Sequence, residues 1–404
     1  MVNLRHVVRS GFAAAVLLGV GTVGAVAQQA TPEASPVVSG LPPLPAGCSV
    51  VAEGFISPRF VAIGADGTAY VSENGFGGDE EFVDPLAAPP PAEDAATPGV
   101  PIDPATPLAE QEAAAAPLAN RGYTGRVSAV APDGTVTVLV EGLASYSGGV
   151  GPHGIVAAPD GMVYVAVGGQ GVLAGLEPLD GENSIHRIDP ATGETSIVAE
   201  LGSYEVANNP DGTDVNPNLY GLGLGPDGML YVNDAGGNVV YRVDPITGDF
   251  SLIGLVPLLD QGGTLRQPVP TGLAVSPDGT IHINILSEGW PADEPGIYAV
   301  SPDGTLTGVG GGLFYAVALT PAADGTVFIT QIFSGFEGPA PLPGNVLRLL
   351  PDGTTEIVLD GLLLPHGGAF DVDGNLYLTV GCIFMGPDGP PGQLLRCEGV
   401  GAAA

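Results

Sequence analysis

Short runs of alternating apolar residues, separated by Asp-Gly pairs, repeat from about residue 50 to the end of the chain. The first run reads Val61-Ala62-Ile63, then Asp66-Gly67, then Ala69-Tyr70-Val71. An Asp-Gly pair between such runs indicates a β-hairpin, because the tight turn needs a positive φ, which strains glycine least. The same pattern recurs at Asp160-Gly161, Asp227-Gly228, Asp278-Gly279, Asp324-Gly325 and Asp373-Gly374.

A second set of turns falls between the members of the first: Asp133-Gly134, Asp303-Gly304, Asp352-Gly353 and the longer Asp189–Gly193 and Asp244–Gly248. Two hairpins per repeat make four strands, and four-stranded repeats in series predict an all-β, six-bladed β-propeller. The Asp-Gly turns then all lie at one end of the propeller. The longer, more varied loops lie at the other end around the central channel, where we expect the functional site.

The two ends of the chain predict how the propeller closes. The last repeat has strands at Gly368–Phe370, Leu376–Val380 and Gln393–Cys397 but no fourth strand, and Ser49–Gly54 is similar to Val136–Gly142 of an earlier repeat. The N-terminal strand is therefore expected to complete the C-terminal blade and to remove two open sheet edges.

The cysteines are consistent with this closure. Cys48 and Cys397 would lie about one residue out of register on the two neighbouring strands, so we expect a disulfide between them and a free Cys382. A Cys382–Cys397 bond within one blade, or three reduced thiols, remain open alternatives.

The termini and one internal segment differ in composition from the repeats. Residues 1–27 read as a signal peptide, with Arg5, His6 and Arg9 before an apolar stretch and Ala25-Val26-Ala27 as the cleavage site. Residues 28–47 are expected to form a disordered Pro/Thr-rich linker, and residues 48–404 the propeller. Residues 84–118, rich in Ala, Pro and acidic residues, are expected to be a disordered insertion in blade 1. We expect a secreted or extracytoplasmic protein without a transmembrane segment after cleavage; a signal retained as an anchor is the alternative.

The charge is strongly negative, with 44 acidic against 10 basic residues and a net charge of −34. A surface of this sign disfavours nucleic acid and anionic lipid as partners, and we expect a monomer. Four arginines recur at one position of the third strand, which indicates a structural role, with carboxylate partners expected between blades: Arg187, Arg242, Arg348 and Arg396.

The first residue of each innermost strand should face the channel mouth. Reading round the ring, these positions hold Arg59, His153, Tyr220, Thr271, Tyr315 and His366. A framework position would repeat one residue type, so this variation predicts a site for a small molecule or an extracellular partner. His153 and His366, both in Pro-His-Gly, are the candidate catalytic residues, although Pro-His-Gly is also a suitable strand-entry turn. Strand-end residues expected near the same mouth are Glu73, Asn74, Asn233 and Asp234.

The connection Tyr204–Tyr220 is dense in oxygen-bearing side chains. Such a set suits Ca²⁺ or another divalent cation, and the candidate ligands are Glu205, Asn209, Asp211, Asp214 and Asn216. The spacing is not that of an EF-hand, and Asn-Pro and Asp-Gly pairs also build turns without a metal.

Several of these segments together resemble the ScyD/ScyE family of exported propellers. The shared segments include Val50–Gly54, Glu73-Asn74-Gly75, Gly151–Gly154, Tyr204–Pro217 and Asn233–Asn238. The resemblance implies a six-bladed propeller related to the NHL and gluconolactonase-like propellers. It supplies no established reaction or catalytic residues, and residues 84–118 depart from the family's shorter loop.

Two neighbouring families define the alternative function. Gluconolactonase-like hydrolases hold a divalent cation at the channel mouth through Glu, Asn and Asp, and this ring does not reproduce that set. Streptogramin B lyases use a His as general base beside Mg²⁺, but they have seven blades. The sequence therefore favours a binding or accessory protein, with a metal-assisted hydrolase or lyase as the alternative.

Overall fold

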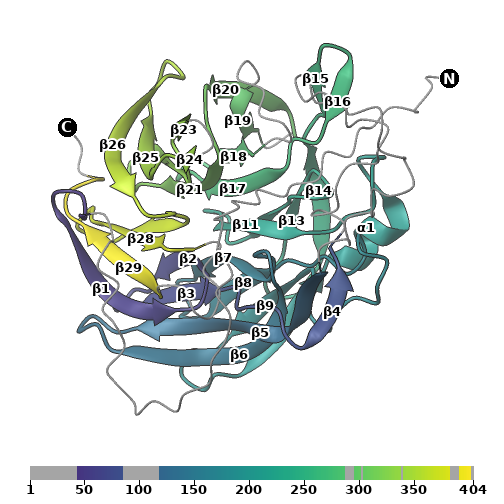
Figure 1. The fold of residues 1–404 in the computed structure, drawn as a ribbon, viewed down its shortest axis with the longest axis horizontal. Helices are drawn as coiled ribbons and strands as arrows, with labels where there is room; N and C mark the ends of the chain where they lie inside the picture. Colours follow the sequence, from purple (N-terminus) through teal and green to yellow (C-terminus); the bar gives the residue numbers. More distant parts are fainter. Residues whose placement is uncertain are drawn as a thin grey trace, which may run out of the picture.

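The computed structural model describes residues 43–84, 118–286, 295–301, 304–337, 340–382 and 391–401. Within them, six sheets are arranged round a common centre as a six-bladed β-propeller (Figure 1). The predicted signal peptide, most of the predicted linker and nearly all of the predicted insertion lie outside the described residues. Among the described residues, no helix is both long and apolar enough to cross a membrane.

Each blade runs from its innermost strand outward. Blade 1 contains β2 (Pro58–Ile63), β3 (Ala69–Glu73), β5 (Leu118–Val130) and β6 (Val136–Tyr146), with β4 (Glu80–Val83) added beside β5. Blade 2 contains β7 (Pro152–Ala157), β8 (Val163–Val167), β9 (Ser184–Ile188) and β10 (Thr195–Glu200), and blade 3 contains β11 (Leu219–Leu224), β12 (Leu230–Asp234), β13 (Val239–Val243) and β14 (Phe250–Leu255).

The second half of the propeller follows the same order. Blade 4 contains β17 (Pro270–Val275), β18 (Ile281–Ile285), β19 (Pro295–Val300) and β20 (Leu306–Gly311), and blade 5 contains β21 (Ala316–Pro321), β22 (Val327–Gln331), β25 (Gly344–Leu349) and β26 (Thr355–Leu362). Blade 6 contains β27 (Gly368–Phe370), β28 (Leu376–Val380), β29 (Gly392–Cys397) and β1 (Cys48–Phe55). The connections add helix α1 (Gly202–Asn208) and two small hairpins, β15 (Leu259–Gln261) with β16 (Thr264–Arg266) and β23 (Phe336–Glu337) with β24 (Ala340–Pro341).

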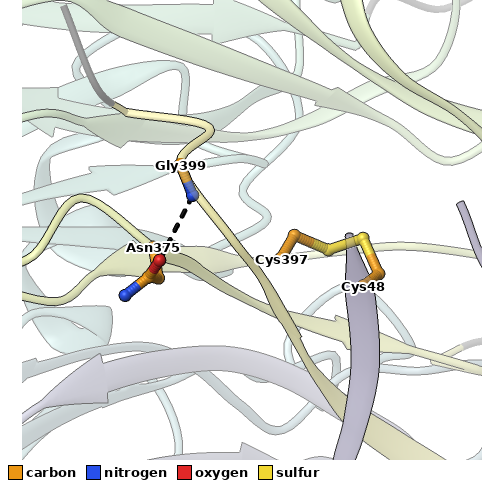
Figure 2. Close-up of a disulfide and its surroundings, with 4 residues drawn as sticks. All are labelled: Cys48, Asn375, Cys397 and Gly399. Atoms are coloured by element: carbon orange, nitrogen blue, oxygen red, sulfur yellow. Dashed lines mark hydrogen bonds between the residues drawn. A yellow bond between two sulfur atoms is a disulfide. The ribbon is translucent and has the colours of Figure 1, made fainter. Parts of the chain in front are cut away.

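The predicted closure is confirmed. Strand β1 is the outer strand of blade 6 and pairs with β29, so the first and last described strands lie side by side (Figure 1). Cys48 and Cys397 form a disulfide at the end of this pair, and Cys382 is free and buried. Figure 2 shows the disulfide beside the turn in which the Gly399 N–H donates to Asn375 Oδ1. The two cysteines are direct register partners rather than one residue apart, because a bulge at Val50–Ala52 realigns the strands.

The Asp-Gly turns form as predicted, and their side chains explain the recurrence. Gly67, Gly228 and Gly325 all have positive φ, between 77° and 90°. In each of these turns the Asp carboxylate accepts the backbone N–H two residues later, at 3.0 Å for Asp66 and Thr68. The Asp therefore closes the turn locally and the Gly supplies its left-handed backbone.

A bulge follows the start of the innermost strand in blades 1 to 5. In blades 2, 3 and 4 the residue inside the bulge is a glycine packed against the backbone of the next blade. A methyl group on Gly154 would lie 2.3 Å from the Leu222 nitrogen, and one on Gly221 would lie 2.6 Å from the Thr271 oxygen. Blade-to-blade packing thus requires the glycine but leaves the residue before it free to vary.

The recurring arginines bond within blades, which corrects the expected pairing between blades. Arg242 pairs with Asp227 at 2.9 Å in blade 3, and Arg348 pairs with Glu356 at 2.6 Å in blade 5. The strand register explains this pairing. Arg242 lies opposite Tyr231 on the neighbouring strand of the same sheet, and its side chain extends along that strand pair to Asp227 in the turn. Blades are joined instead by apolar clusters, such as the one in which Tyr164 and Ile185 of blade 2 meet Leu222 and Val232 of blade 3.

Candidate functional site

Four of the six predicted ring residues meet at the centre of the propeller. Arg59, His153, Tyr220 and His366, which come from four different blades, form what we call the channel cluster. The Tyr220 ring stacks on His153 with centroids 4.1 Å apart, and its hydroxyl lies 2.8 Å from His366 Nε2. Phe60 packs its edge against His366 at 4.9 Å. The four residues were among the six ring positions named from the sequence, which did not indicate that Tyr220 lies between the two histidines.

Arg59 is a buried cation, with 2% of its surface exposed. Its Nη2 donates to the Gly149 carbonyl oxygen at 2.7 Å, and the Asn74 amide donates to the same oxygen at 2.5 Å. No carboxylate of the described residues pairs with Arg59, and its Nε has no hydrogen-bond partner there. Burying a charge without an ion-pair partner is costly, and within the described part of this acidic protein Arg59 is such a charge.

Both histidines of the channel cluster are buried and neutral. Burial lowers the pKa of His153 well below its usual value, and the nearby Arg59 charge lowers it further. Burial, Arg59 and then His153 do the same to the pKa of His366. Neither ring nitrogen of His153 has a hydrogen-bond partner among the described residues, and neither does Nδ1 of His366. The cluster thus presents unpartnered donors and acceptors as well as a charge.

Tyr220 is the one member of the channel cluster that keeps some exposed surface. Burial raises its pKa to about 12, so its hydroxyl stays protonated and is able to donate to His366. Cys382 is buried nearby, and burial raises the pKa of its thiol to about 12. A thiol in this state is not a reactive nucleophile.

The remaining two ring positions do not join the cluster. Thr271 donates to the Ala316 carbonyl oxygen at 3.2 Å and accepts from Asn284. Tyr315 has a positive φ of 47° and packs edge-on against Phe333 at 5.2 Å between centroids. Both therefore lie in contacts between and within blades 4 and 5.

Residues near the ends of the second strands differ in how many partners they have. Glu73 is fully paired: its oxygens accept from the Ile56 N–H and the Ser128 hydroxyl, and it forms an ion pair of 2.8 Å with Arg126. Asn233 Oδ1 accepts the Gly221 N–H inside the blade 3 bulge at 2.5 Å. Among the described residues, Nδ2 of Asn233 and Oδ1 of Asn74 have no hydrogen-bond partner, and Asn74 shares the Gly149 carbonyl oxygen with Arg59. Asn74 is the residue of this set that the geometry associates with the channel cluster.

A repeated hydrogen bond explains the position of Asn233. In blades 1, 3 and 4 a polar side chain accepts an N–H inside the bulge, and in blade 6 one accepts the N–H of the residue before β27, the acceptors being Ser72, Asn233, Asn284 and Thr379. Three of them also donate to a carbonyl of the next blade: Ser72 to His153, Asn284 to Ala316 and Thr379 to Arg59. These hydrogen bonds join neighbouring blades and hold the backbone at or next to the ring positions.

The predicted metal loop forms α1 and an extended turn. Asn209 ends α1 in a left-handed conformation and bonds the Thr213 carbonyl oxygen and the Gly212 N–H. Asp211 accepts from Thr213 and, at 2.6 Å, from Asn238. Asp214 and Asn216 are partly buried in the same turn. Asn209 and Asp211 therefore build the loop, with their side chains already occupied.

Glu205, on α1, and Asp234, at the end of β12, form the second polar centre, which we call the acid pair. Both are completely buried. Asp234 Oδ1 accepts the N–H groups of Asn218, Gly236 and Gly237 at 2.8 to 3.1 Å, whereas its Oδ2 has no partner among the described residues. Neither oxygen of Glu205 has a partner within hydrogen-bond geometry, and the Asn216 N–H only partly offsets the burial.

The environment of the acid pair disfavours ionised carboxylates. Burial, then the charges of Asp234 and Asp211, raise the pKa of Glu205 to about 7. Burial raises the pKa of Asp234 to about 6 against the effect of its three backbone hydrogen bonds. Among the described residues no three His, Cys, Asp or Glu side chains converge as a metal centre. A cation here would need neutral oxygens besides the two carboxylates.

The described surface also contains a small pocket of about 140 Å³, lined by Leu44, Val50, Leu362 and Leu395 among others. It lies between the start of the described chain and blades 5 and 6, and none of the predicted site residues lines it.

Sequence reasoning missed Phe60, Cys382, Asn238 and Tyr241, which complete the two polar centres. Only Asn238 carried a signal, as a potential left-handed residue after two glycines.

Comparison with known proteins supports the fold. No protein-family profile matches the chain. A gluconolactonase from Zymomonas mobilis subsp. mobilis is 26% identical over 228 residues, which cover 51% of this chain and 62% of that enzyme. The match therefore spans less than two thirds of the relative.

Two solved structures have a similar architecture. A protein from Thermus thermophilus, provisionally described as an oxidoreductase (glucose dehydrogenase), has a TM-score of 0.50 at 18% identity, covering 86% of this chain and 98% of that one. A Bacteroides thetaiotaomicron protein of unknown function has a TM-score of 0.51 at 14% identity, covering 86% of this chain and 75% of that one. At these identities the likeness concerns the fold alone.

Proposed function

We propose that this chain is an exported binding protein of the ScyD/ScyE kind, and that it binds a small molecule with an anionic or carbonyl oxygen at the channel cluster. The observation that supports this most is Arg59, a buried guanidinium without a carboxylate partner among the described residues. Guanidinium groups recognise carboxylates through charge-assisted hydrogen bonds. The Cys48–Cys397 disulfide is consistent with an oxidising, extracytoplasmic compartment.

The rest of the cluster suits a flat ligand. The Tyr220 ring stacks on His366 and Phe60 packs against it edge-on. The nitrogens of His153 and Nδ1 of His366, which have no partner among the described residues, offer one donor or acceptor each in the neutral form. Apolar rings with a few converging polar groups are typical of small-molecule sites. Tyr220, which is partly exposed, is the side from which solvent reaches the cluster.

Arg59 is expected to serve binding rather than stability. If Arg59 is removed, Asn74 still donates to the Gly149 carbonyl oxygen, so that oxygen does not lose its last partner. Arg59→Met keeps an unbranched side chain as long as that of Arg up to Nε and removes the guanidinium charge. We therefore expect the variant to unfold at the same or a higher temperature than the wild type, and to lose ligand binding.

The test is a set of carboxylate probes, namely acetate, gluconate and benzoate, measured by calorimetric titration and by melting temperature. Arg242→Met is the matched control, because Arg242 is exposed and paired with Asp227. The wild type and the control should bind at least one probe, and Arg59→Met should bind none. Equal binding by Arg59→Met, or no response of the wild type to any of the three anions, would disprove the anion site.

Lactone hydrolysis is the second candidate. It is favoured by the gluconolactonase relative and by the Tyr220 hydroxyl, which lies 2.8 Å from His366 Nε2 and forms an acid–base pair close to Arg59. Hydrolysis of glucono-δ-lactone above its spontaneous rate, with Ca²⁺, Zn²⁺ or Mn²⁺ or with a chelator, tests this. If the wild type turns over the lactone and His366→Gln does not, hydrolysis rather than binding is the function. A rate equal to that of the buffer would exclude hydrolysis of this lactone.

A further inference from the structure

We propose that the acid pair, Glu205 and Asp234, together with neutral oxygens around it, binds a divalent cation of the calcium type and fastens the connection between blades 2 and 3 to blade 3. This site is separate from the channel cluster and does not depend on the proposed function.

The first argument is the number of buried oxygens without a partner. Both oxygens of Glu205, Oδ2 of Asp234 and Oδ1 of Asn238 are buried and accept no hydrogen bond from the described residues. No ion pair of the described residues reaches Glu205 or Asp234. Asp234 keeps three backbone donors on Oδ1, but a buried carboxylate without a counter-charge still costs several kcal/mol, so a positively charged species is the natural complement.

The second argument is that these groups converge on one place. A methyl group on Gly237 would lie 3.0 Å from Glu205 Oε2 and 3.3 Å from Asp234 Cγ. A methyl group on the adjacent Gly236 would overlap the Asn216 carbonyl oxygen. The two glycines therefore let a carboxylate from α1, a carboxylate from β12 and the carbonyl oxygen of Asn216 approach the same short stretch of backbone.

The third argument is that the surroundings hold these groups in place. Three backbone N–H groups orient Asp234 through Oδ1, which leaves Oδ2 directed away from the turn. Tyr204 packs α1 against Tyr241 and Phe250, with centroids 6.0 and 5.5 Å away. Asn238 is fixed by its bonds to Asp211 and Gln267. Ligands held by a second set of contacts are typical of built metal sites.

The chemistry favours Ca²⁺ over Mg²⁺. Two carboxylates with amide and backbone oxygens from an irregular loop match the flexible, oxygen-rich coordination of Ca²⁺, whereas Mg²⁺ requires near-ideal octahedral geometry and retains its waters. The competing arrangement is a single proton held by the acid pair. A proton neutralises one charge but leaves most of these acceptors without a donor.

Calorimetric titration of the chelator-treated protein at about 0.15 M salt, where surface charges are screened beyond ~8 Å, tests the proposal. We expect one saturable Ca²⁺ site that binds more tightly than Mg²⁺, and a melting temperature that rises with Ca²⁺. Tb³⁺, which occupies Ca²⁺ sites, should show luminescence sensitised by nearby tyrosines such as Tyr241. These measurements use the wild-type protein and so do not depend on whether a variant folds.

Glu205→Gln is the informative variant, since it keeps the shape of the side chain and removes one charge. It should lose both the Ca²⁺ response and the Tb³⁺ signal, whereas Glu200→Gln, which alters an exposed carboxylate just before α1, should keep both. A wild type that melts identically in Ca²⁺ and chelator, or a Glu205→Gln protein that binds Ca²⁺ like the wild type, would overturn the proposal. A calcium-insensitive wild type that Glu205→Gln stabilises would show that a proton occupies the acid pair instead.

Discussion

The channel cluster and the acid pair lie on either side of one short segment, yet their charges are opposite. Residues 216–220 connect them: the Asn218 N–H donates to Asp234, and Tyr220, two residues later, stacks on His153. Within the described part of the chain, the first centre is a buried guanidinium without a carboxylate partner, and the second is two buried carboxylates without an Arg, Lys or His partner. Neither centre neutralises the other across this segment. The two proposed sites therefore differ in the sign of the ligand that each would take.

The two centres also differ in what their residues do for the fold. Arg59 occupies a ring position that the packing leaves free, and its hydrogen-bond acceptor has a second donor in Asn74. Asp234 holds three backbone N–H groups of the turn that carries Gly236 and Gly237. Arg59 is therefore not needed to hold the backbone in place, whereas Asp234 of the acid pair is.

The largest expected effect is on global stability, and it should leave the ligand responses of both centres unchanged. Replacing Cys48 and Cys397 by Ala opens a covalent loop with a sequence separation of 349 residues, and the chain-entropy model gives a loss of about 6 kcal/mol in the free energy of unfolding. Denaturant titration measures this loss. Neither the Arg59-dependent anion response nor the Glu205-dependent Ca²⁺ response should change in the folded double variant. Equal unfolding curves for variant and wild type would contradict the role of the disulfide in closure.

Two substitutions of Asp234 have the next largest expected effect, and they separate the loss of its hydrogen bonds from the loss of its charge. Asp234→Ala leaves three backbone N–H groups without their acceptor and should cost about 3 kcal/mol. Asp234→Asn keeps an oxygen for them and should cost less than ~1 kcal/mol, although it removes the same charge. Denaturant unfolding of the two variants in chelator provides the comparison. A similar loss for both would mean that the charge, rather than the turn, is what Asp234 contributes.

The pH dependence distinguishes the two centres by sign. Burial lowers the pKa of His153 and His366 below the usual 6.5, so below that pH the unfolded chain binds more protons than the folded one. Their contribution is complete above pH 6.5 and is lost as the pH falls, at up to about 1.4 kcal/mol per pH unit for each histidine. Of the groups facing them, Tyr220 and Cys382, with pKa values of about 12, stay protonated.

The acid pair acts in the opposite direction, because carboxylates with raised pKa values favour the folded state as the pH falls. A His153→Gln, His366→Gln double variant should therefore lose less stability than the wild type between pH 7 and pH 5, and Glu205→Gln should lose more. Thermal unfolding across this range checks both slopes. Parallel profiles for all three proteins would contradict the assignment of opposite signs.

The smallest effect concerns the hydroxyl of Tyr220. Tyr220→Phe keeps the stacking on His153 but removes the partner of His366 Nε2, which should cost about 1 kcal/mol. Tyr231→Phe is the control, because its hydroxyl bonds Asp227 at the surface. Denaturant unfolding should separate the two by a small margin. A larger loss of unfolding free energy for Tyr231→Phe would mean that the surface hydrogen bond stabilises the fold more than the one in the channel cluster.

The sequence predicted the architecture well because its signals are local. Asp66 and Thr68 form their hydrogen bond within one turn, and Gly67 meets its φ requirement regardless of what lies across the channel. The closure by residues 49–54 could also be predicted, since the missing strand and the spare strand resemble the repeats. The pairing of Arg242 could not, because its direction depends on the side chain opposite it in the sheet.

The candidate sites were predictable only in part. The ring positions follow from the repeat, so Arg59, His153, Tyr220 and His366 could be named together, and the loop composition drew attention to Glu205. Which of these side chains meet was not predictable. Thr271 and Tyr315 occupy equivalent ring positions but pack elsewhere, and Asn209 and Asp211 bond within their own turn while Glu205 keeps no partner.

The sequence by itself determined the six blades, their turns, the closing strand and the ring of variable positions, because each depends on neighbours a few residues apart or on the repetition of one pattern. The tertiary structure alone decided that Arg59 and the acid pair are buried without counter-charges. That outcome depends on how residues more than a hundred positions apart share one interior, where side-chain direction and burial, rather than composition, set which charges meet.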